Sequence, residues 1–492
     1  MKGPLSASWW LIGLVLLAGV ACQQTPEVKK HKAVERGRQY IEAGKLGEAV
    51  IEFRNALGVD PDFVAALHPL GLAYTRKAWY FDAVRELSRA RRVAPDSLPI
   101  ATDLGRALVE IGAWAEAAEQ ADFILSRQPD NPHALYIRAA ALLGSGKAAE
   151  ALAVVARAPT TSPLSDLEAT RGEALLSLGR LDEAERAFRA AVGRNPGDAK
   201  SLSGLGAVSL ERKDYPAAVA LYEQAKKLEP EQPRIRLGLA VAKARLGKLS
   251  DAIRELEELD PRARLPEVVM TLGLYHLRAR KPEEAIAILA PLVRQLPRLS
   301  TARLLLANAL VEAERPDEAA LELDELAVLL PGEAAVEFQR AVVATKLGRP
   351  REALEQLTRV ARQLQGAPEY HFERGRALFL LGRLEEAAQA ASSALRLAPQ
   401  APQPYLLLGE IRSQQGDFKA AGELLAKGAE LDAGYAPARL ALGRFHLRQG
   451  ETQAALREFE AAVEADPGSL EAARARAREL IREKRMGEAI EF

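Results

Sequence analysis

The sequence predicts an all-α solenoid, a long array of helix–turn–helix units that stack on one another. Three observations lead to this fold class. An alanine recurs every 33 or 34 residues, a small residue stands twelve positions before it, and in ten units a proline stands twelve positions after it. A chain of 492 residues is too long for one compact core, and periods of this length are typical of repeat architectures.

The recurring alanine stands near the start of the second helix of each unit. Twelve residues earlier, on the first helix, the residue is always Gly or Ala. Small side chains at both positions let the two helices of a unit approach closely, and a larger one would overpack the site at a cost of about 1–3 kcal/mol. The alanines are Ala49, Ala83, Ala117, Ala151, Ala184, Ala218, Ala252, Ala285, Ala319, Ala353, Ala387, Ala421, Ala455 and Ala489.

The turn between the two helices has its own signals. In eleven units Asp or Glu directly precedes the alanine, where its charge meets the positive end of the second helix's dipole. Pro69 lies inside a first helix and is expected to bend or break it. Glycine, which accepts the left-handed conformation that ends a helix, follows the first helix at Gly44, Gly112, Gly146, Gly179, Gly247, Gly348, Gly382, Gly416 and Gly450.

This pattern resembles the tetratricopeptide repeat (TPR), whose unit is 34 residues of helix–turn–helix. The resemblance implies a right-handed α-solenoid superhelix of about 13–14 repeats over residues 30–492. One repeat cannot bury its own apolar face, so we expect all of them to stack continuously. The units are 30–63, 64–97, 98–131, 132–164, 165–198, 199–232, 233–265, 266–299, 300–333, 334–367, 368–401, 402–435, 436–469 and a partial 470–492; Pro261 comes early, so unit 233–265 should end short.

Residues 1–21 have the features of an export signal. Lys2 precedes an uninterrupted apolar run of 12 residues, Trp9–Val20, which is too short for a spanning helix of about 20 and fits a secretory signal peptide. The stretch also resembles a bacterial lipoprotein signal, in which small residues precede a cysteine that receives lipid. Ala21 and Cys22, the only cysteine, match that pattern. Gly19 departs from it, because the usual residue there is leucine.

An uncleaved anchor, and a plain signal peptide with an idle cysteine, are the alternatives to lipidation. Residues 22–29 are expected to form a short tether. In that lipoprotein family a residue such as Gln23 after the cysteine implies sorting to the outer membrane. The resemblance therefore implies an outer-membrane lipoprotein that faces the periplasm, with a soluble periplasmic protein as the alternative. Each buried CH₂ of the acyl chains would contribute about 0.8 kcal/mol to membrane attachment.

Charge and residue spacing exclude several classes of function. Lys plus Arg is 67 and Asp plus Glu is 67, so no basic excess draws the protein to nucleic acid. One cysteine forms no internal disulfide or cysteine cluster, and no two of the six histidines stand three or four residues apart as metal ligands on one helix face would. With no phosphate-binding Gly-rich loop and no nucleophile matched to a histidine, we expect no catalytic residues, no metal and no cofactor.

In TPR proteins the first helices line the concave face, and here the middle and later units carry large apolar residues at those positions. These favour a groove that docks a partner segment, such as an amphipathic helix. Tight coiling, in which the same side chains pack on neighbouring helices, is the open alternative. The residues are Leu237, Val241, Met270, Leu274, Leu277, Leu304, Val311, Phe338, Val342, Phe372 and Phe379; toward the C-terminus these positions turn basic, with Arg444, Arg448, Arg474, Arg478 and Arg482.

These expectations combine into a membrane-anchored periplasmic scaffold that binds proteins through its concave groove. Similar lipoproteins assist assembly of secretion, pilus or exopolysaccharide-export machines. The second hypothesis is a periplasmic holdase or carrier that shelters hydrophobic peptides or acyl chains in the groove. A scaffold should retain one or two stoichiometric partners, whereas a carrier should bind many unrelated hydrophobic peptides.

Overall fold

The computed structural model describes residues 25–158 and 165–490, and this part of the chain is entirely α-helical, with 28 helices and no strand. The all-α prediction is confirmed. The signal segment 1–21 and Cys22 lie outside the described residues. Among the helices that are described, none is both long enough and apolar enough to cross a bilayer.

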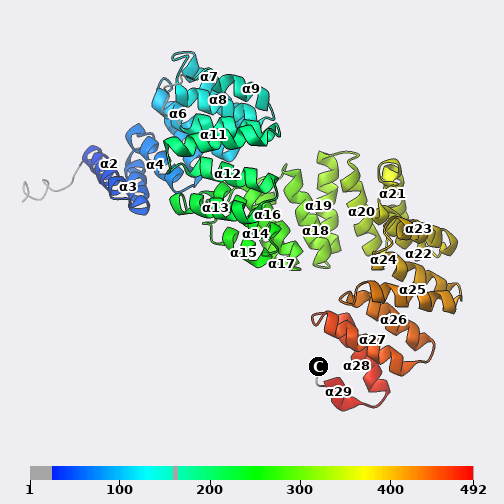
Figure 1. Cartoon of the computed structure of the whole chain (residues 1–492). Coiled ribbons are helices and arrows are strands. Elements are labelled where there is room, and N and C mark those ends of the chain that lie inside the picture. Colours follow the sequence, from blue (N-terminus) through cyan, green and yellow to red (C-terminus); the bar gives the residue numbers. More distant parts are fainter. Residues whose placement is uncertain (1–24, 159–164, 491–492) are drawn as a thin grey trace, which may run out of the picture. The chain divides into compact units, whose positions relative to one another are not determined.

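Even-numbered helices are the first helices of the repeats, and odd-numbered helices are the second helices (Figure 1). The close contacts fall into two compact units, residues 1–279 and 280–492. The period of the sequence runs through this boundary without a change. Within each unit the helices pack in chain order.

The described part of unit 1 contains seven helix pairs and the first helix of an eighth. One contiguous cluster of buried side chains extends from Ala33 to Ala174 between the helices of its N-terminal part. The helices are α2 (Pro26–Glu42), α3 (Leu46–Val59), α4 (Val64–Arg76), α5 (Tyr80–Val93), α6 (Leu98–Ile111), α7 (Trp114–Leu125), α8 (Pro132–Gly144), α9 (Ala148–Val155), α10 (Ser165–Ser177), α11 (Leu181–Arg194), α12 (Ala199–Glu211), α13 (Tyr215–Leu228), α14 (Pro233–Arg245), α15 (Leu249–Glu257) and α16 (Pro266–Arg278).

Unit 2 continues the alternation from a second helix to the end of the described chain. Smaller buried clusters lie between its successive helix pairs. The helices are α17 (Pro282–Gln295), α18 (Ser300–Glu312), α19 (Pro316–Leu329), α20 (Ala334–Lys346), α21 (Pro350–Leu364), α22 (Pro368–Leu380), α23 (Leu384–Leu397), α24 (Pro402–Gln414), α25 (Phe418–Leu431), α26 (Ala436–Arg448), α27 (Thr452–Ala465), α28 (Leu470–Arg482) and α29 (Met486–Ile490).

The small residues predicted from the sequence lie where the two helices of a repeat pack most closely against each other. Thirteen of the fourteen recurring alanines are 0% exposed. Four residues after the alanine, the second helix often carries a large side chain that occupies the space left by a glycine of the first helix. A Cβ added at Gly37 would stand 2.5 Å from the Phe53 ring, closer than such atoms can approach. Each glycine therefore makes room for a specific large neighbour.

The same large side chain also joins one repeat to the next. Tyr222 of α13 lies against Gly206 of α12, where an added Cβ would stand 2.8 Å from the ring, and it also lies against Gly238 of α14. The ring is 4% exposed. One side chain on a second helix thus fills gaps on two successive first helices, which couples neighbouring repeats through direct packing.

The turn glycines behave as predicted. All nine have positive φ, as at Gly112, where φ is 76° and the amide donates back to the carbonyl of Val109. Five further turns reach the left-handed region without glycine, at a cost of about 1–2 kcal/mol each. These residues are Ala78, Lys213, Arg280, Glu314 and Lys484, with φ between 54° and 62°.

Three local expectations have different outcomes. Residues 26–29 of the expected tether are helical, because α2 begins at Pro26; the Thr25 side chain accepts a hydrogen bond from the amide of Val28 and caps the helix. Pro69 does not break α4, because as the sixth residue it removes only the hydrogen bond near the helix start. The repeat 233–265 does end short, since its second helix α15 has 9 residues, whereas α13, the second helix of the preceding repeat, has 14.

We predict that Gly37→Ala destabilises the first repeat by about 1–3 kcal/mol, because the added methyl group collides with Phe53. Gly58→Ala on the neighbouring α3 is the matched control. Nothing lies within 4 Å of a Cβ there, so replacing a helical glycine should be neutral or stabilising by up to about 1 kcal/mol. Amide hydrogen exchange of α2 and α3 measures both effects; equal protection in the two variants would contradict the predicted packing.

Candidate functional site

The first helices form the inner face of each unit. Within a unit, neighbouring first helices such as α8 and α10 or α22 and α24 approach each other closely. Neighbouring second helices make no such contacts in the described part of either unit. Each unit therefore curves around its first helices, and we call their free surface the inner face. The concave surface predicted from the family resemblance corresponds to this face.

In unit 1, side chains from different first helices meet across the inner face. Lys200 of α12 places Nζ 4.8 Å from the ring centre of Tyr136 on α8, and 3.5 Å from a carboxylate oxygen of Glu173 on α10. Arg106 of α6 pairs with Asp166 of α10 at 3.3 Å. Tyr136 is 4% exposed, and burial raises its pKa to about 12. Bulky polar side chains therefore fill this part of the inner face.

A second set of contacts closes unit 1 on itself across more than one hundred residues of sequence. The Gln232 amide donates to the hydroxyl of Tyr80 at 3.0 Å, a separation of 152 positions along the chain. Arg234 donates to the carbonyl oxygen of Glu110 at 3.0 Å. We call these contacts the clasp; it also includes the Arg262 guanidinium, which lies 4.6 Å from the ring centre of Trp79. The clasp joins side chains that lie far apart in the sequence of unit 1.

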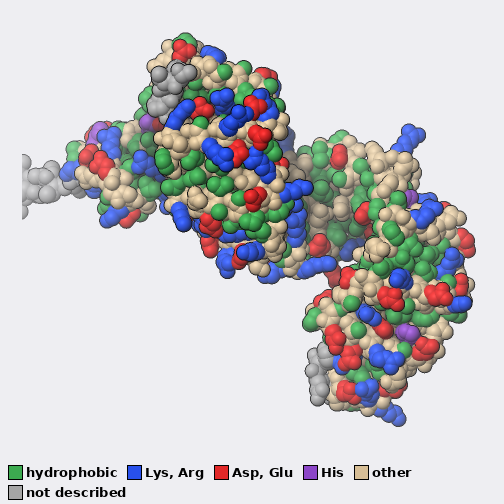
Figure 2. All heavy atoms as spheres, in the orientation of Figure 1, with side chains coloured by type: hydrophobic (Ala, Val, Ile, Leu, Met, Phe, Trp, Pro, Cys, Tyr) green, Lys and Arg blue, Asp and Glu red, His purple; other side chains and the backbone are tan. Residues whose placement is uncertain are grey.

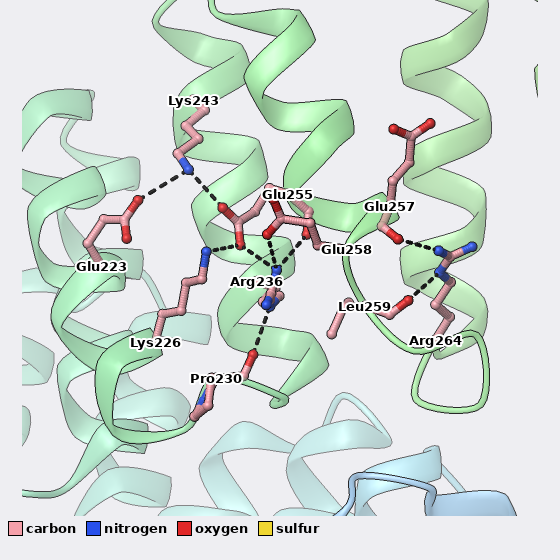
Figure 3. Close-up of polar contacts among 10 residues, drawn as sticks. All are labelled: Glu223, Lys226, Pro230, Arg236, Lys243, Glu255, Glu257, Glu258, Leu259 and Arg264. Atoms are coloured by element: carbon pink, nitrogen blue, oxygen red, sulfur yellow. Dashed lines mark hydrogen bonds and ion pairs between the residues drawn. The ribbon is translucent and has the colours of Figure 1, made fainter.

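A buried ion network ties three helices of unit 1 together around Glu255, which is 4% exposed (Figure 3). One carboxylate oxygen lies 2.8 Å from Lys226 Nζ and 3.1 Å from an Arg236 nitrogen, and the other lies 2.8 Å from Lys243 Nζ. Glu258 adds a more exposed carboxylate 3.0 Å from Arg236. Burial acts to raise the pKa of Glu255, but hydrogen bonds from the two lysines outweigh it, and the pKa is lowered.

The loop after the short α15 is held in a similar way. Arg264 donates to the carbonyl oxygens of Glu257 at 2.6 Å and Leu259 at 3.2 Å (Figure 3). These bonds satisfy carbonyls that the shortened helix leaves without partners. The cations around Glu255 are paired within the protein, so we assign this network a structural role.

Unit 2 has an open cavity of about 190 Å³ on its inner face. Four successive first helices, α22, α24, α26 and α28, line it, together with Tyr435 from the turn before α26. No second helix contributes. The lining residues are Phe372, Arg376, Gln403, Leu406, Leu407, Glu410, Tyr435, Pro437, Leu440, Ala441, Arg444 and Glu471. We call this cavity the unit 2 pocket.

The charged groups of the unit 2 pocket are unequally satisfied. Arg376 donates to both carboxylate oxygens of Glu373, at 2.8 and 3.1 Å. Arg444 pairs with Glu471. Glu410, between them on α24, has no hydrogen bond and no cation within 4.0 Å among the described residues. The pocket therefore contains one carboxylate that the protein itself does not pair.

Burial raises the pKa of two titratable groups in the unit 2 pocket. Desolvation raises the pKa of Glu410, although Arg444, Arg448 and Arg376 act in the opposite direction. Burial likewise raises the pKa of Tyr435. Basic and acidic side chains are interspersed over the visible face of both units (Figure 2).

The predicted groove residues lie on first helices, but they are not freely exposed. Ten of the eleven are half-buried, and Leu277 is 8% exposed. Phe338 packs against the buried cluster that includes Ala341, while Phe372 and Phe379 pack against the cluster around Leu378. Phe372 also lines the unit 2 pocket. A docking role for these residues stays a prediction.

The sequence analysis missed the polar half of the pocket. Arg376, Glu410 and Arg444 stand 34 residues apart and each follows the small residue of its first helix. They therefore occupy one equivalent position in three successive repeats. A comparison of this one position in successive repeats, instead of a search for apolar residues alone, reveals a row of charged residues. Arg444 was noted only as part of a basic C-terminal end.

Two family models, both described as "Tetratricopeptide repeat", match the chain. One matches residues 102–166, 170–233, 270–334 and 338–402, which is more than half of the chain. The other matches residues 209–273 and 412–479.

Among curated proteins, the TPR repeat-containing protein PA4667 of Pseudomonas aeruginosa is 32% identical over 198 residues, which are 39% of this chain and 33% of that protein. The human protein O-mannosyl-transferase TMTC1 is 26% identical over 232 residues, which are 46% of this chain and 26% of that protein. The chain thus spans about a quarter to a third of the length of these relatives.

Similar solved structures include the APC/C hetero-tetramer Cut9–Hcn1. It has a TM-score of 0.41 and 16% identity, over 96% of this chain and 99% of that one. The thermophilic TPR protein TTC0263 of Thermus thermophilus has a TM-score of 0.36 and 22% identity, over 37% of this chain and 99% of that one.

We predict that Glu255→Gln destabilises unit 1 by about 3 kcal/mol at pH 7, because it leaves three cations without their shared carboxylate. The folded pKa of Glu255 lies below its ordinary value of 4.5. Its contribution is therefore present above about pH 4.5 and is lost as the pH falls through the lower folded value. The difference between variant and wild type should shrink accordingly in urea unfolding at pH 7 and pH 3.

Glu258→Gln is the control for this network. Its carboxylate contacts the same arginine, but its side chain is 50% exposed, so we expect a loss below about 1 kcal/mol. Equal losses for the two variants, or a difference independent of pH, would contradict the central role of Glu255.

Proposed function

Because the chain belongs to the tetratricopeptide repeat family, whose repeats bind protein partners, we propose that it is a membrane-anchored scaffold of the bacterial envelope. Its inner face in unit 2 holds a segment of the partner protein. Unit 1 serves as a structural part of the scaffold, since its own side chains contact one another across its inner face. The process it serves is assembly of an envelope machine for secretion, pilus formation or exopolysaccharide export.

The observation that carries this proposal is the unit 2 pocket. It is open, it is lined only by first helices and the turn before α26, and it combines apolar walls with charged groups. A surface of this kind suits a protein segment, because apolar contacts supply affinity while a few polar groups select the partner. Four repeats contribute to it, so a bound segment would contact several of them at once.

The carrier hypothesis has less support. A cavity of about 190 Å³ is below the range of about 300–1,000 Å³ that holds whole small ligands. It accommodates a side chain or two, not an acyl chain. The large apolar residues of the inner face are half-buried against the fold, which leaves less apolar surface for unfolded chains. We therefore favour a scaffold with one or two partners.

The proposal includes no catalytic step. The human relative is named as a transferase, but the similarity covers 26% of that protein at 26% identity. Within the described residues no group of three or more His, Cys, Asp or Glu side chains is arranged to hold a metal ion. The charged clusters around Glu255 and between Arg106 and Asp166 are ion pairs between helices, which is the arrangement of a structural element.

The membrane attachment is proposed from the first 22 residues. The apolar run Trp9–Val20, followed by Ala21 and the only cysteine, favours lipidation at Cys22 and an outer-membrane location facing the periplasm. Helix α2 begins at Pro26, so the lipid would lie within a few residues of the first repeat.

A larger side chain that fills the unit 2 pocket should prevent the partner from binding. We predict that Leu406→Trp reduces co-purification of one or two stoichiometric partners from crosslinked membranes by at least about tenfold, because the indole occupies the cavity. Leu397→Trp, at a 47% exposed site outside the pocket, should retain them. Undiminished capture by Leu406→Trp would contradict this site, and capture of many unrelated hydrophobic peptides would favour the carrier.

Removing the thiol should release the protein. We predict that Cys22→Ser moves the protein from the membrane fraction to the soluble fraction, because the attached acyl chains would supply the binding energy for the bilayer. Membrane fractionation with and without high salt measures the change. A Gln23→Ser variant retains the thiol and should stay on membranes; unchanged fractionation of Cys22→Ser would exclude lipid attachment at this residue.

A further inference from the structure

We propose that the unit 2 pocket takes a basic side chain, lysine or arginine, from the partner segment. This inference rests on the proposed function and specifies the chemistry of its site. The occupant's cation pairs with Glu410, and its methylene stem lies on the apolar wall of the pocket.

The charges that line the pocket support this assignment. There are four of them: Arg376, Arg444, Glu410 and Glu471. Arg376 is paired with Glu373, and Arg444 with Glu471. Only Glu410 has no ion pair and no hydrogen bond among the described residues. Among the four lining charges, the one left without a partner is negative.

The surroundings of Glu410 make its carboxylate selective for a charged hydrogen-bond donor. Desolvation by burial is the largest influence on the carboxylate, and it disfavours the ionised form even with three arginines in the surroundings. An ionised carboxylate offers only acceptor sites, so it gains most from a charged donor that enters the same partly buried space. A lysine ammonium or an arginine guanidinium provides such a donor.

The walls of the pocket fit the rest of such a side chain. Phe372, Leu406 and Leu440 occupy one equivalent position on three successive first helices, 34 residues apart. They form an apolar strip beside the charged row. Lysine and arginine have long aliphatic stems that pack on apolar surfaces while the charged end reaches a polar partner.

Other occupants fit less well. An acidic side chain would compete with Glu373 or Glu471 for an arginine and would lie beside the unpaired Glu410, where like charges repel. A purely apolar side chain would bury Glu410 further without supplying a donor, which is unfavourable. The basic side chain is the occupant that completes the pairing in the pocket.

The test uses 12-residue peptides selected from a random display library on the full-length protein. Only peptides whose binding is lost in Leu406→Trp are kept, so that each one occupies the pocket. We expect them to share a Lys or Arg at one position. Fluorescence polarisation then measures their affinity for wild type, Glu410→Gln and Glu430→Gln.

Glu410→Gln should weaken these peptides by about tenfold or more, because a charge-assisted hydrogen bond is lost. Glu430→Gln removes the same charge from an exposed residue of α25 outside the pocket, and it should change affinity less than twofold. Glu410 makes no bond within the described protein, so the variant should keep the folded circular dichroism spectrum.

A double-mutant cycle separates pairing from general electrostatics. Replacing the peptide's basic residue by norleucine keeps the stem and removes the charge. This change should cost about tenfold against wild type and less than twofold against Glu410→Gln. Equal losses against both proteins, or selected peptides enriched in acidic residues, would overturn the inference. In either case the proposed docking site would still stand.

A different outcome of the peptide selection would contradict the proposed function itself. If none of the selected peptides depends on the pocket in the Leu406→Trp comparison, the pocket is not a docking site. The inference about Glu410 then falls with it.

Discussion

Close packing between a small residue on each first helix and a large one on the second helix is the contact on which the array depends. Where the small residue is glycine, the absence of a side chain leaves a space that a ring such as Phe53 or Tyr222 fills. The Tyr222 ring also contacts the first helix of the next repeat. Packing within a repeat and packing between repeats are therefore one interaction. Because it recurs about every 34 residues, stability accumulates by nearest-neighbour contacts along each unit.

The same packing determines which surface is available for binding. First helices lie close together and second helices do not, so each unit curves and its first helices present the inner face. In unit 1 that face is occupied by Lys200, Tyr136 and Arg106 and is joined by the clasp. In unit 2 the corresponding positions leave a cavity. One architecture thus carries paired side chains across the inner face of one unit and a cavity on the inner face of the other.

Buried charge serves two purposes here. Around Glu255 three cations share one carboxylate, so the short repeat is stabilised although its second helix has 9 residues where α13 has 14. At Glu410 a half-buried carboxylate has no partner within the described protein, which makes it a candidate for contact with another molecule. Sequence alone does not separate these cases, because both glutamates stand on helices among basic residues.

The sequence by itself determined the helices, their pairing and their turns. A 33–34-residue period, small residues at two positions and left-handed glycines depend on local packing and backbone geometry, which repeat identically and can be read from one chain. Tertiary structure alone decided the clasp between Tyr80 and Gln232, the division into two units and the pocket around Glu410. Those features depend on how much each repeat turns relative to the last. Small rotations add up over many repeats, so residues 152 positions apart meet in a way that no single repeat encodes.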